Sequence, residues 1–355
     1  MASIATTEPL RTQLKVEKLR QARLVYPLEL RHSQKNVNMI AFNATETLMA
    51  ACTADCLVNV YNAITFKLVN QFRTDVALKY ICFSRSDLIV AGSVYTYFFV
   101  LDPLQNQAEG VELSGLGPRE LNISAIDISL FDKYLGVLYD DKFEGRSSFV
   151  LYNFPLLQPA ITLQALEATL IGETQNFGAL RFKFFLSEDT IFCAQSRRVW
   201  RGQISAGVVQ QEVSLDLPDE RTVRSMTFSP RFDFLILSCM DGVVVVDPLA
   251  LRVLRTFDSQ YPVACAQLSA LAYASQPKFH LIFGGGIEAI HQATTSKAGN
   301  QVSIFDLATE ERVGEFKDFY ACINWVLVFK DGSGFITAGE EGACRIYRFD
   351  ASYYQ

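Results

Sequence analysis

A short apolar strand that ends in Asp or Asn recurs along this chain of 355 residues. The clear copies are VNVYN, FFVLD, FVLYN, VVVVD, VSIFD and IYRFD, which end at Asn62, Asp102, Asn153, Asp247, Asp306 and Asp350. A degraded copy, RVWRG, ends at Gly202. The mean spacing of the copies, about 48 residues, is typical of arrays whose repeats each fold as four short strands. The pattern therefore predicts a ring of seven such units.

Each repeat also has the order of elements that a propeller blade needs. A strand leads into a turn such as FSPRFDF (228–234), and a second strand then leads into a tight turn such as MDG (240–242). The Asp-closed strand, a polar turn and a last strand follow, as in VVVVDPLALRVLRTF (243–257). Asp-Gly turns supply the positive φ of tight hairpins, and unbroken apolar runs indicate strands covered on both faces. We predict an all-β, seven-bladed β-propeller.

The two ends of the chain suggest how the ring closes. Only ASYYQ follows Asp350, so the seventh blade lacks an outer strand, whereas RLVYPLEL (23–30) precedes the first repeat. We predict that this segment completes the C-terminal blade, because closure removes exposed sheet edges. The propeller would span 23–355, and residues 1–22 would form a flexible or short helical extension. A cleavable presequence is the alternative, against which Glu8 and Glu17 argue.

Composition narrows the classes of function. Half of the residues are apolar, 20% are charged and the net charge is -6, so the chain has no basic field for direct sequence-specific nucleic-acid binding. The eight cysteines include no CxxC pair, which favours buried reduced thiols over disulfides or zinc ligands. No apolar stretch is long enough to span a membrane. We expect a cytoplasmic protein without metal, cofactor or membrane contact.

The segment GGGIEAIHQATTSKAG (284–299) raises the question of a phosphate-binding loop. Such a loop needs the spacing GxxxxGK[ST] ahead of a helix, but Lys297 lies far from the glycines and the strand VSIF follows. The structural interpretation, a close approach at a strand end, is therefore favoured. It predicts a positive φ at one or more of Gly284, Gly285 and Gly286.

Residues that could serve catalysis or lipid binding form no recognisable pattern. His32, His280 and His291 lie in separate repeats, and no nucleophile motif such as GxSxG accompanies them. We therefore predict that the protein is not an enzyme. Arg197 and Arg198 in SRRVWRG differ from the Phe-Arg-Arg-Gly motif of phosphoinositide-binding propellers. An exposed hairpin is expected there, with lipid binding as the alternative.

The last two repeats carry several short motifs in a fixed order. Gly-Gly-Gly-x-Glu-Ala precedes a Thr-rich insertion and an acidic pair with Gly, and Gly-Glu-x-Gly, Arg-Ile and Phe-Asp-x-x-Tyr follow. These motifs resemble those of the WD-repeat subunit i of eukaryotic translation initiation factor 3, most strongly over 220–355. They comprise Gly284, Gly285, Gly286, Glu288, Ala289, Thr294, Thr295, Glu310, Glu311, Gly314, Gly339, Glu340, Gly342, Arg345, Ile346, Phe349, Asp350, Tyr353 and Tyr354. Common WD signatures are missing, since the chain has no Trp-Asp or Gly-His pair, so apolar packing must hold the blades.

The resemblance implies a non-catalytic scaffold. In that family, subunit i binds the C-terminal tail of subunit b and a segment of subunit g during recruitment of the small ribosomal subunit, mRNA binding and scanning. The alternative is another cytosolic WD-repeat interaction scaffold, in signalling or RNP assembly.

The same resemblance points to residues in the fifth blade. The b tail engages blades five and six in the family, and the corresponding strand here is VVVVDPLAL, so Val245 and Asp247 are the expected contacts. Asp247 has an alternative role, which is only to cap its strand. Arg231 stands where the family has Asp after Ser-Pro, which implies a partner with compensating charge.

Overall fold

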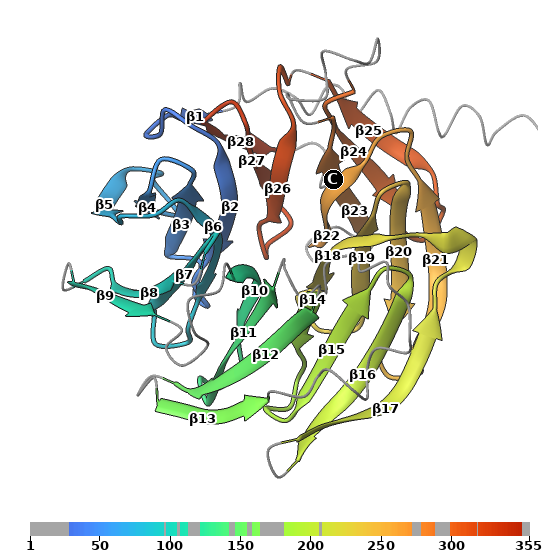
Figure 1. Cartoon of the computed structure of the whole chain (residues 1–355). Helices are drawn as coiled ribbons and strands as arrows, with labels where there is room; N and C mark the ends of the chain where they lie inside the picture. The colour runs from blue at the N-terminus through green and yellow to red at the C-terminus, as the bar shows by residue number, and fades with distance from the viewer. Residues whose placement is uncertain are drawn as a thin grey trace, which may run out of the picture.

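Seven four-stranded antiparallel sheets surround a central axis in the computed structural model (Figure 1). The structure describes residues 28–95, 97–104, 107–112, 121–141, 146–154, 158–163, 181–205, 208–271, 278–287, 299–317 and 319–349. Each sheet is one blade, and consecutive blades follow one another around the ring. The seven-bladed propeller predicted from the repeats is thereby confirmed.

In blades one to six the strands run from the axis outward in chain order. Blades one and two comprise β2 (Val37–Phe42), β3 (Leu48–Thr53), β4 (Leu57–Asn62), β5 (Leu68–Arg73), β6 (Leu78–Phe83), β7 (Ile89–Ser93), β8 (Tyr97–Asp102) and β9 (Gln107–Glu112). Blades three and four comprise β10 (Leu121–Ile128), β11 (Tyr134–Asp141), β12 (Arg146–Asn153), β13 (Gln158–Leu163), β14 (Arg181–Phe184), β15 (Thr190–Gln195), β16 (Arg198–Ser205) and β17 (Val208–Asp216).

The remaining blades repeat this arrangement. Blades five and six comprise β18 (Val223–Phe228), β19 (Leu235–Cys239), β20 (Gly242–Asp247), β21 (Arg252–Asp258), β22 (Val263–Leu271), β23 (Lys278–Gly285), β24 (Gln301–Asp306) and β25 (Arg312–Phe316). Blade seven comprises β26 (Ile323–Val328), β27 (Gly334–Gly339), β28 (Cys344–Arg348) and β1 (Leu28–Leu30). One 3₁₀ turn, Pro218–Glu220, links blades four and five.

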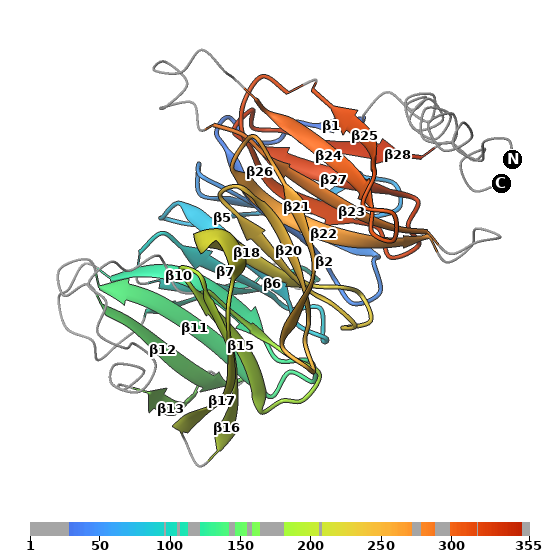
Figure 2. The same cartoon turned by 90° about the vertical axis from the view of Figure 1, so that its right-hand side faces the viewer.

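The turns of the blades emerge on two opposite faces of the ring, which Figure 2 shows from the side. Because the strands are antiparallel, the turns after the first and third strands of every blade share one face, which we call the lower face. The turns after the second strands and the connections between blades share the upper face. On the upper face, Gly242 and Gly342 have the expected positive φ, 154° and 75°.

Blade four keeps all four strands, but its third strand does not end where the degraded repeat copy ends. β16 continues beyond Gly202 to Ser205 and pairs with β17 through a bulge between Arg201 and Gly202. A Gly at this position offers no side-chain acceptor to close a turn, so the strand runs on.

An N-terminal strand closes the ring, as predicted. β1 pairs with β28 in the register Leu28 with Ile346 and Leu30 with Cys344. The Glu29 carboxylate lies 3.6 Å from the Arg345 guanidinium on the opposing strand. Residues 23–27 of the expected closing segment, and the proposed extension 1–22, lie outside the described residues.

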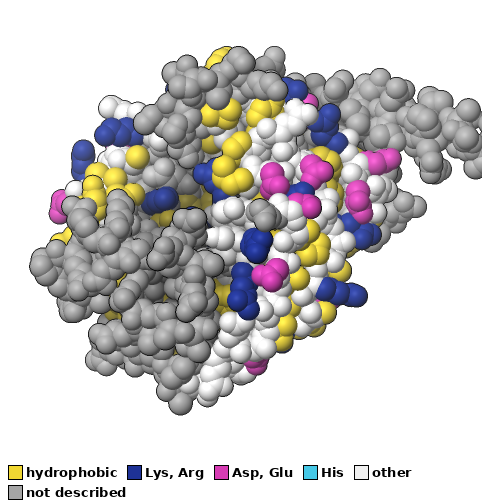
Figure 3. All heavy atoms as spheres, turned by 45° about the vertical axis from the view of Figure 1, so that its right-hand side comes forward, with side chains coloured by type: hydrophobic (Ala, Val, Ile, Leu, Met, Phe, Trp, Pro, Cys, Tyr) yellow, Lys and Arg dark blue, Asp and Glu magenta, His cyan; other side chains and the backbone are white. Residues whose placement is uncertain are grey.

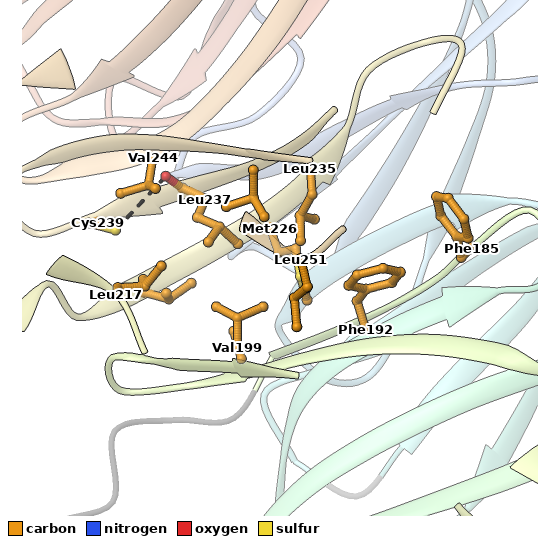
Figure 4. Packing of buried hydrophobic residues seen from close by; sticks show 13 residues of the cluster. Phe185, Phe192, Val199, Leu217, Met226, Leu235, Leu237, Cys239, Val244 and Leu251 are labelled. Carbon is orange, nitrogen blue, oxygen red and sulfur yellow. Dashed lines mark hydrogen bonds between the residues drawn. The ribbon is translucent and has the colours of Figure 1, made fainter. Parts of the chain in front are cut away.

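The hydrophobic core consists of clusters between blades rather than within them. The described residues form seven clusters, each shared by two adjacent blades. Figure 4 shows the cluster in which Phe192 and Val199 of blade four face Met226 and Leu237 of blade five. Both faces of a blade are thus covered, which explains why inner strands are unbroken apolar runs.

Carboxylates on the lower face tie several blades to the preceding blade. Asp132 of blade three accepts hydrogen bonds from the backbone N–H groups of Arg85 and Ser86 in blade two, at 2.8 and 3.0 Å. Glu188 of blade four accepts one from the N–H of Phe131 in blade three, at 2.6 Å. In blade one, Glu46 likewise accepts from the N–H of Lys330 in blade seven, at 3.0 Å. These bonds hold neighbouring turns together in a chain that lacks the common WD side-chain pairs.

Substitution of Leu30 tests the closure of the ring. Leu30 is 6% exposed and packs into the cluster between blades seven and one, whereas its neighbour Leu28 is 46% exposed. Because Leu30→Asp buries an unpaired carboxylate, we expect it to reduce the free energy of unfolding by roughly 3 kcal/mol in thermal or urea denaturation. Leu28→Asp is the matched control and should have little effect. Equal stability of both variants and the wild type would show that β1 does not hold the ring.

Candidate functional site

The lower face of blade five carries two of the predicted partner-binding residues. Asp247 is the last residue of β20, and Arg231 lies in the turn between β18 and β19. Arg231 is exposed, and the side chain of Asp247 is 26% exposed. The antiparallel topology therefore brings an anion and a cation to the same face of one blade. Whether either residue contacts a partner stays a prediction.

Val245 does not form the surface contact that the sequence suggested. Its side chain is fully buried and belongs to the cluster between blades five and six, together with Ile236, Leu281 and Phe283. β20 is paired with β19 on one edge and β21 on the other. The expectation that Val245 contacts a partner from the surface is therefore corrected. An inner strand that is covered on both faces leaves no side chain free for a partner.

Asp247 closes the turn that follows its strand. Its Oδ1 atom accepts hydrogen bonds from the N–H groups of Leu249 and Ala250, at 2.9 and 3.0 Å. Leu251 then adopts a positive φ of 47°, and its side chain packs between blades four and five. The capping role considered for Asp247 is therefore present. This side-chain-closed turn followed by a left-handed residue is a common three-to-five-residue hairpin connection.

The same cap explains the repeat from which the fold was predicted. Asn62 accepts the N–H groups of Ile64 and Thr65 at 3.0 and 2.8 Å, and Asp306 accepts those of Ala308 and Thr309 at 2.9 and 3.0 Å. The same turn thus follows the third strand in blades one, five and six.

The hydrogen bond from the Ala250 N–H is the main cause that lowers the pKa of Asp247. Slight burial opposes the effect, while the Leu249 N–H and the Arg252 guanidinium, whose Nε lies 3.6 Å from Oδ2, add to it. Asp247 is therefore ionised at neutral pH. Its Oδ2 atom remains the only part of the carboxylate outside the two turn hydrogen bonds.

Leu249 supplies the exposed apolar group that the sequence-based prediction assigned to Val245. Its side chain is 71% exposed beside Asp247. The turn is held rigid by Arg201 of blade four, whose Nη1 donates to the carbonyl of Leu249 at 2.9 Å. Ile64 and Leu104 occupy the equivalent turn position in blades one and two and are 72% and 82% exposed. The signal that could have identified Leu249 is its place two residues after the closing Asp.

The glycines of blade six lie at a strand end, as predicted. β23 ends at Gly285, and Gly286 has a φ of 150°. A Cβ atom on Gly285 would lie 2.0 Å from the carbonyl oxygen of Pro262, and one on Gly286 would lie 2.2 Å from Oδ1 of Asn300. The expected positive φ is confirmed at Gly286. The insertion with Glu288, Ala289, Thr294 and Thr295 lies outside the described residues, as does His291.

The other sites considered from the sequence show no convergence of reactive groups. Arg197 and Arg198 form an exposed hairpin, as predicted, and Arg198 donates to the Ser214 hydroxyl at 3.1 Å. His32 contacts the Tyr61 hydroxyl at 3.2 Å, and His280 is buried in another blade. In the described part of the chain no three His, Cys, Asp or Glu side chains are grouped as metal ligands.

The cysteines and the surface charges of the described residues indicate no reactive thiol pair and, in the view of Figure 3, no strongly charged face. All eight cysteines are free, and burial raises the pKa of Cys52, Cys265 and Cys344 to about 12, so these thiols stay protonated. On the described part of the face in Figure 3, Lys and Arg side chains are interspersed with Asp and Glu. Within the described residues, no helix is long and apolar enough to cross a membrane.

Comparisons with known proteins agree with the fold and with the family that the sequence motifs resemble. The model of the family "WD domain, G-beta repeat" matches residues 26–62. The chain is 30% identical to eukaryotic translation initiation factor 3 subunit I of Kluyveromyces lactis over 158 residues, 43% of this chain and 44% of the relative. It is 34% identical to the Taeniopygia guttata subunit over 148 residues, 41% of this chain and 42% of the relative.

The alignments with these two relatives thus span less than half of their length. The Dictyostelium discoideum subunit is 23% identical over 346 residues, which cover 93% of this chain and 96% of the relative. The resemblance to the WD-repeat subunit i of initiation factor 3 is therefore confirmed.

Two substitutions separate the cap of Asp247 from its charge. Asp247→Ala removes the acceptor of two N–H groups and should lower stability by about 1 kcal/mol in urea denaturation. Asp247→Asn should retain the turn, because Asn62 makes the same two bonds in blade one. Equal stability of the Ala variant and the wild type would show that the cap contributes nothing.

The lowered pKa of Asp247 predicts how the stability of the fold depends on pH. A carboxylate with a folded-state pKa below its unfolded value of about 3.9 stabilises the fold above that pH. The contribution is lost as the pH falls through the folded-state value. The stability advantage of wild type over Asp247→Asn should therefore be constant near neutrality and shrink below about pH 4 in urea titrations.

Proposed function

We propose that this chain is a non-catalytic scaffold subunit of translation initiation factor 3. In this role it holds subunits b and g of the complex near the small ribosomal subunit during recruitment, mRNA binding and scanning. The observation that carries the proposal is the alignment with the Dictyostelium discoideum subunit I, which covers 93% of the chain and so extends into every blade.

The state of the polar groups supports a scaffold rather than an enzyme. The carboxylates of Asp132, Glu188 and Glu46 accept hydrogen bonds from the turns of neighbouring blades, and that of Asp247 caps its own turn. Groups used in this way stiffen the lower face and are not left to converge on a substrate. A rigid face loses little conformational entropy when a partner docks.

The lower face of blade five is the proposed contact for the tail of subunit b. Leu249 offers an exposed apolar anchor, Asp247 an anion that accepts Arg or Lys, and Arg231 a cation that requires an acidic residue on the partner. An amphipathic helix with one apolar residue between a basic and an acidic residue fits this combination. The contact acts in the cytosol, where translation initiates.

Affinity purification of the full chain from cytosol tests the proposed function. At moderate salt, subunits b and g should be recovered with the chain in mass spectrometry. Recovery of a different set of proteins, without b and g, would assign the chain to another interaction scaffold and overturn the proposal.

The proposed contact at Leu249 is tested by introducing the same carboxylate at equivalent turn positions of blades five and two. Leu249→Asp should weaken binding of a synthetic b-subunit tail at least about tenfold in calorimetric titration, because it puts a carboxylate in an apolar contact. Leu104→Asp is the matched control, since Leu104 is 82% exposed at the same turn position in blade two. If both variants bind the tail like the wild type, the contact lies elsewhere on the ring.

A further inference from the structure

A cavity of about 650 Å³ occupies the central channel. Its walls are the inner strands of all seven blades, and residues of the lower-face turns such as Arg85, Phe131 and Phe232 continue its lining. The volume lies within the range of about 300–1,000 Å³ that is usual for sites of small organic ligands. Nothing in the scaffold role described above uses this cavity.

One residue from each inner strand forms a ring around the cavity. In six blades the inner strand has a β-bulge near its start. The ring residue lies four positions after the residue at which that bulge begins. In blade four the ring residue is Lys183. The next residue, Phe184, donates its N–H to Asp127 of blade three. The ring comprises Ala41, Cys82, Asp127, Lys183, Thr227, Gln267 and Leu327. Blades three to six thus supply a polar arc, and blades seven, one and two supply an apolar arc.

The polar arc keeps donors as well as acceptors free. Asp127 accepts from the Lys183 ammonium at 2.6 Å and from the Phe184 N–H at 2.9 Å. Gln267 uses its carbonyl oxygen to accept from the Val328 N–H at 3.0 Å. The two further N–H groups of Lys183 and the amide nitrogen of Gln267 therefore remain as donors within the described structure. Acceptor oxygens on a ligand would pair with these donors.

The ammonium of Lys183 is charged and lies toward the channel axis. Burial by itself would lower the pKa of Lys183, but the charge of Asp127 and their hydrogen bond outweigh it, so the pKa is raised. Burial raises the pKa of Cys82 and Cys265, and the charge of Lys183 opposes this rise in both. Those thiols belong to blades two and six, which lie two places from blade four in each direction around the ring.

The apolar arc faces this ammonium with an indole ring. Trp325 of β26 packs against the clusters of blades six and seven, seven and one, and one and two, so it covers the channel wall beside blade seven. It lines the cavity together with Leu327 and Phe42. Toward the lower face, Leu130 and Phe131 extend the apolar lining and are 39% and 57% exposed. A flat apolar group can therefore enter and stack beside Trp325.

We propose that the channel cavity binds a ligand that joins an aromatic group to a carboxylate. The carboxylate accepts hydrogen bonds from Lys183 and Gln267, and the aromatic group packs against Trp325 and Leu327. Free aromatic acids and the C-terminal carboxylate of a peptide that ends in an aromatic residue share this chemistry. The proposal is independent of the assignment to initiation factor 3.

Calorimetric titration of the full chain with matched probes tests the site. N-acetyl-L-phenylalanine should bind at least about tenfold more tightly than N-acetyl-L-phenylalaninamide, which lacks the charge, and more tightly than acetate, which lacks the ring. The peptide Gly-Gly-Gly-Phe with a free C-terminus distinguishes the two sources of the ligand. It should bind more tightly than N-acetyl-L-phenylalanine if the site takes a peptide end, because its preceding residues would contact the lining at the lower face. Equal binding of acid and amide, or binding of neither at millimolar concentration, would overturn the proposal.

Variants locate the binding in the channel. The double variant Asp127→Asn/Lys183→Gln keeps a hydrogen-bonded pair without charges and should abolish the preference for the acid while circular dichroism shows an unchanged fold. Arg198→Gln removes a cation outside the cavity and should leave the preference intact. Tryptophan emission should change on binding and still do so in Trp200→Phe, since Trp200 is buried between blades three and four. A double variant that still prefers the acid would place the site elsewhere.

Discussion

Each blade buries both of its faces against its neighbours, so the fold depends on contacts between blades. The valines of β20 show this directly, because Val244 and Val246 pack toward blade four while Val243 and Val245 pack toward blade six. A four-stranded sheet with two apolar faces cannot be stable alone in water. The ring must therefore close, and β1 and β28 close it with a short ladder in which Leu30 is buried.

The polar contacts between blades replace a signature that this sequence lacks. Turn residues with positive φ reach back to the preceding blade, as Asp132 and Asp87 do with their carboxylates. Blade five departs from this pattern. Phe232 has a φ of 61° and packs its ring 5.9 Å from that of Phe185 in blade four. An apolar contact there leaves the neighbouring Arg231 exposed, which distinguishes the lower face of this blade.

The rigid ring sets two different chemical environments. On the lower face it presents short turns whose carboxylates accept backbone N–H groups, beside exposed apolar side chains such as Leu249, the proposed contact. In the channel it gathers one residue from every blade and separates a polar arc from an apolar one. The lower face suits a partner protein that docks on the surface, and the channel suits a small ligand that enters it.

The sequence by itself determined the number of blades, through the recurring Asp and Asn that end their third strands, and the segment that closes the ring. These depend on local chemistry, since Asn62 and Asp247 bond to N–H groups two and three residues away, and Gly286 is needed at a crowded strand end. Only the tertiary structure decided that Leu249 is exposed while Leu251 of the same turn packs between blades four and five, because the neighbouring blade determines which turn side chain is covered. It alone placed Lys183 on Asp127, since these residues lie 56 positions apart and meet only when neighbouring blades pack together.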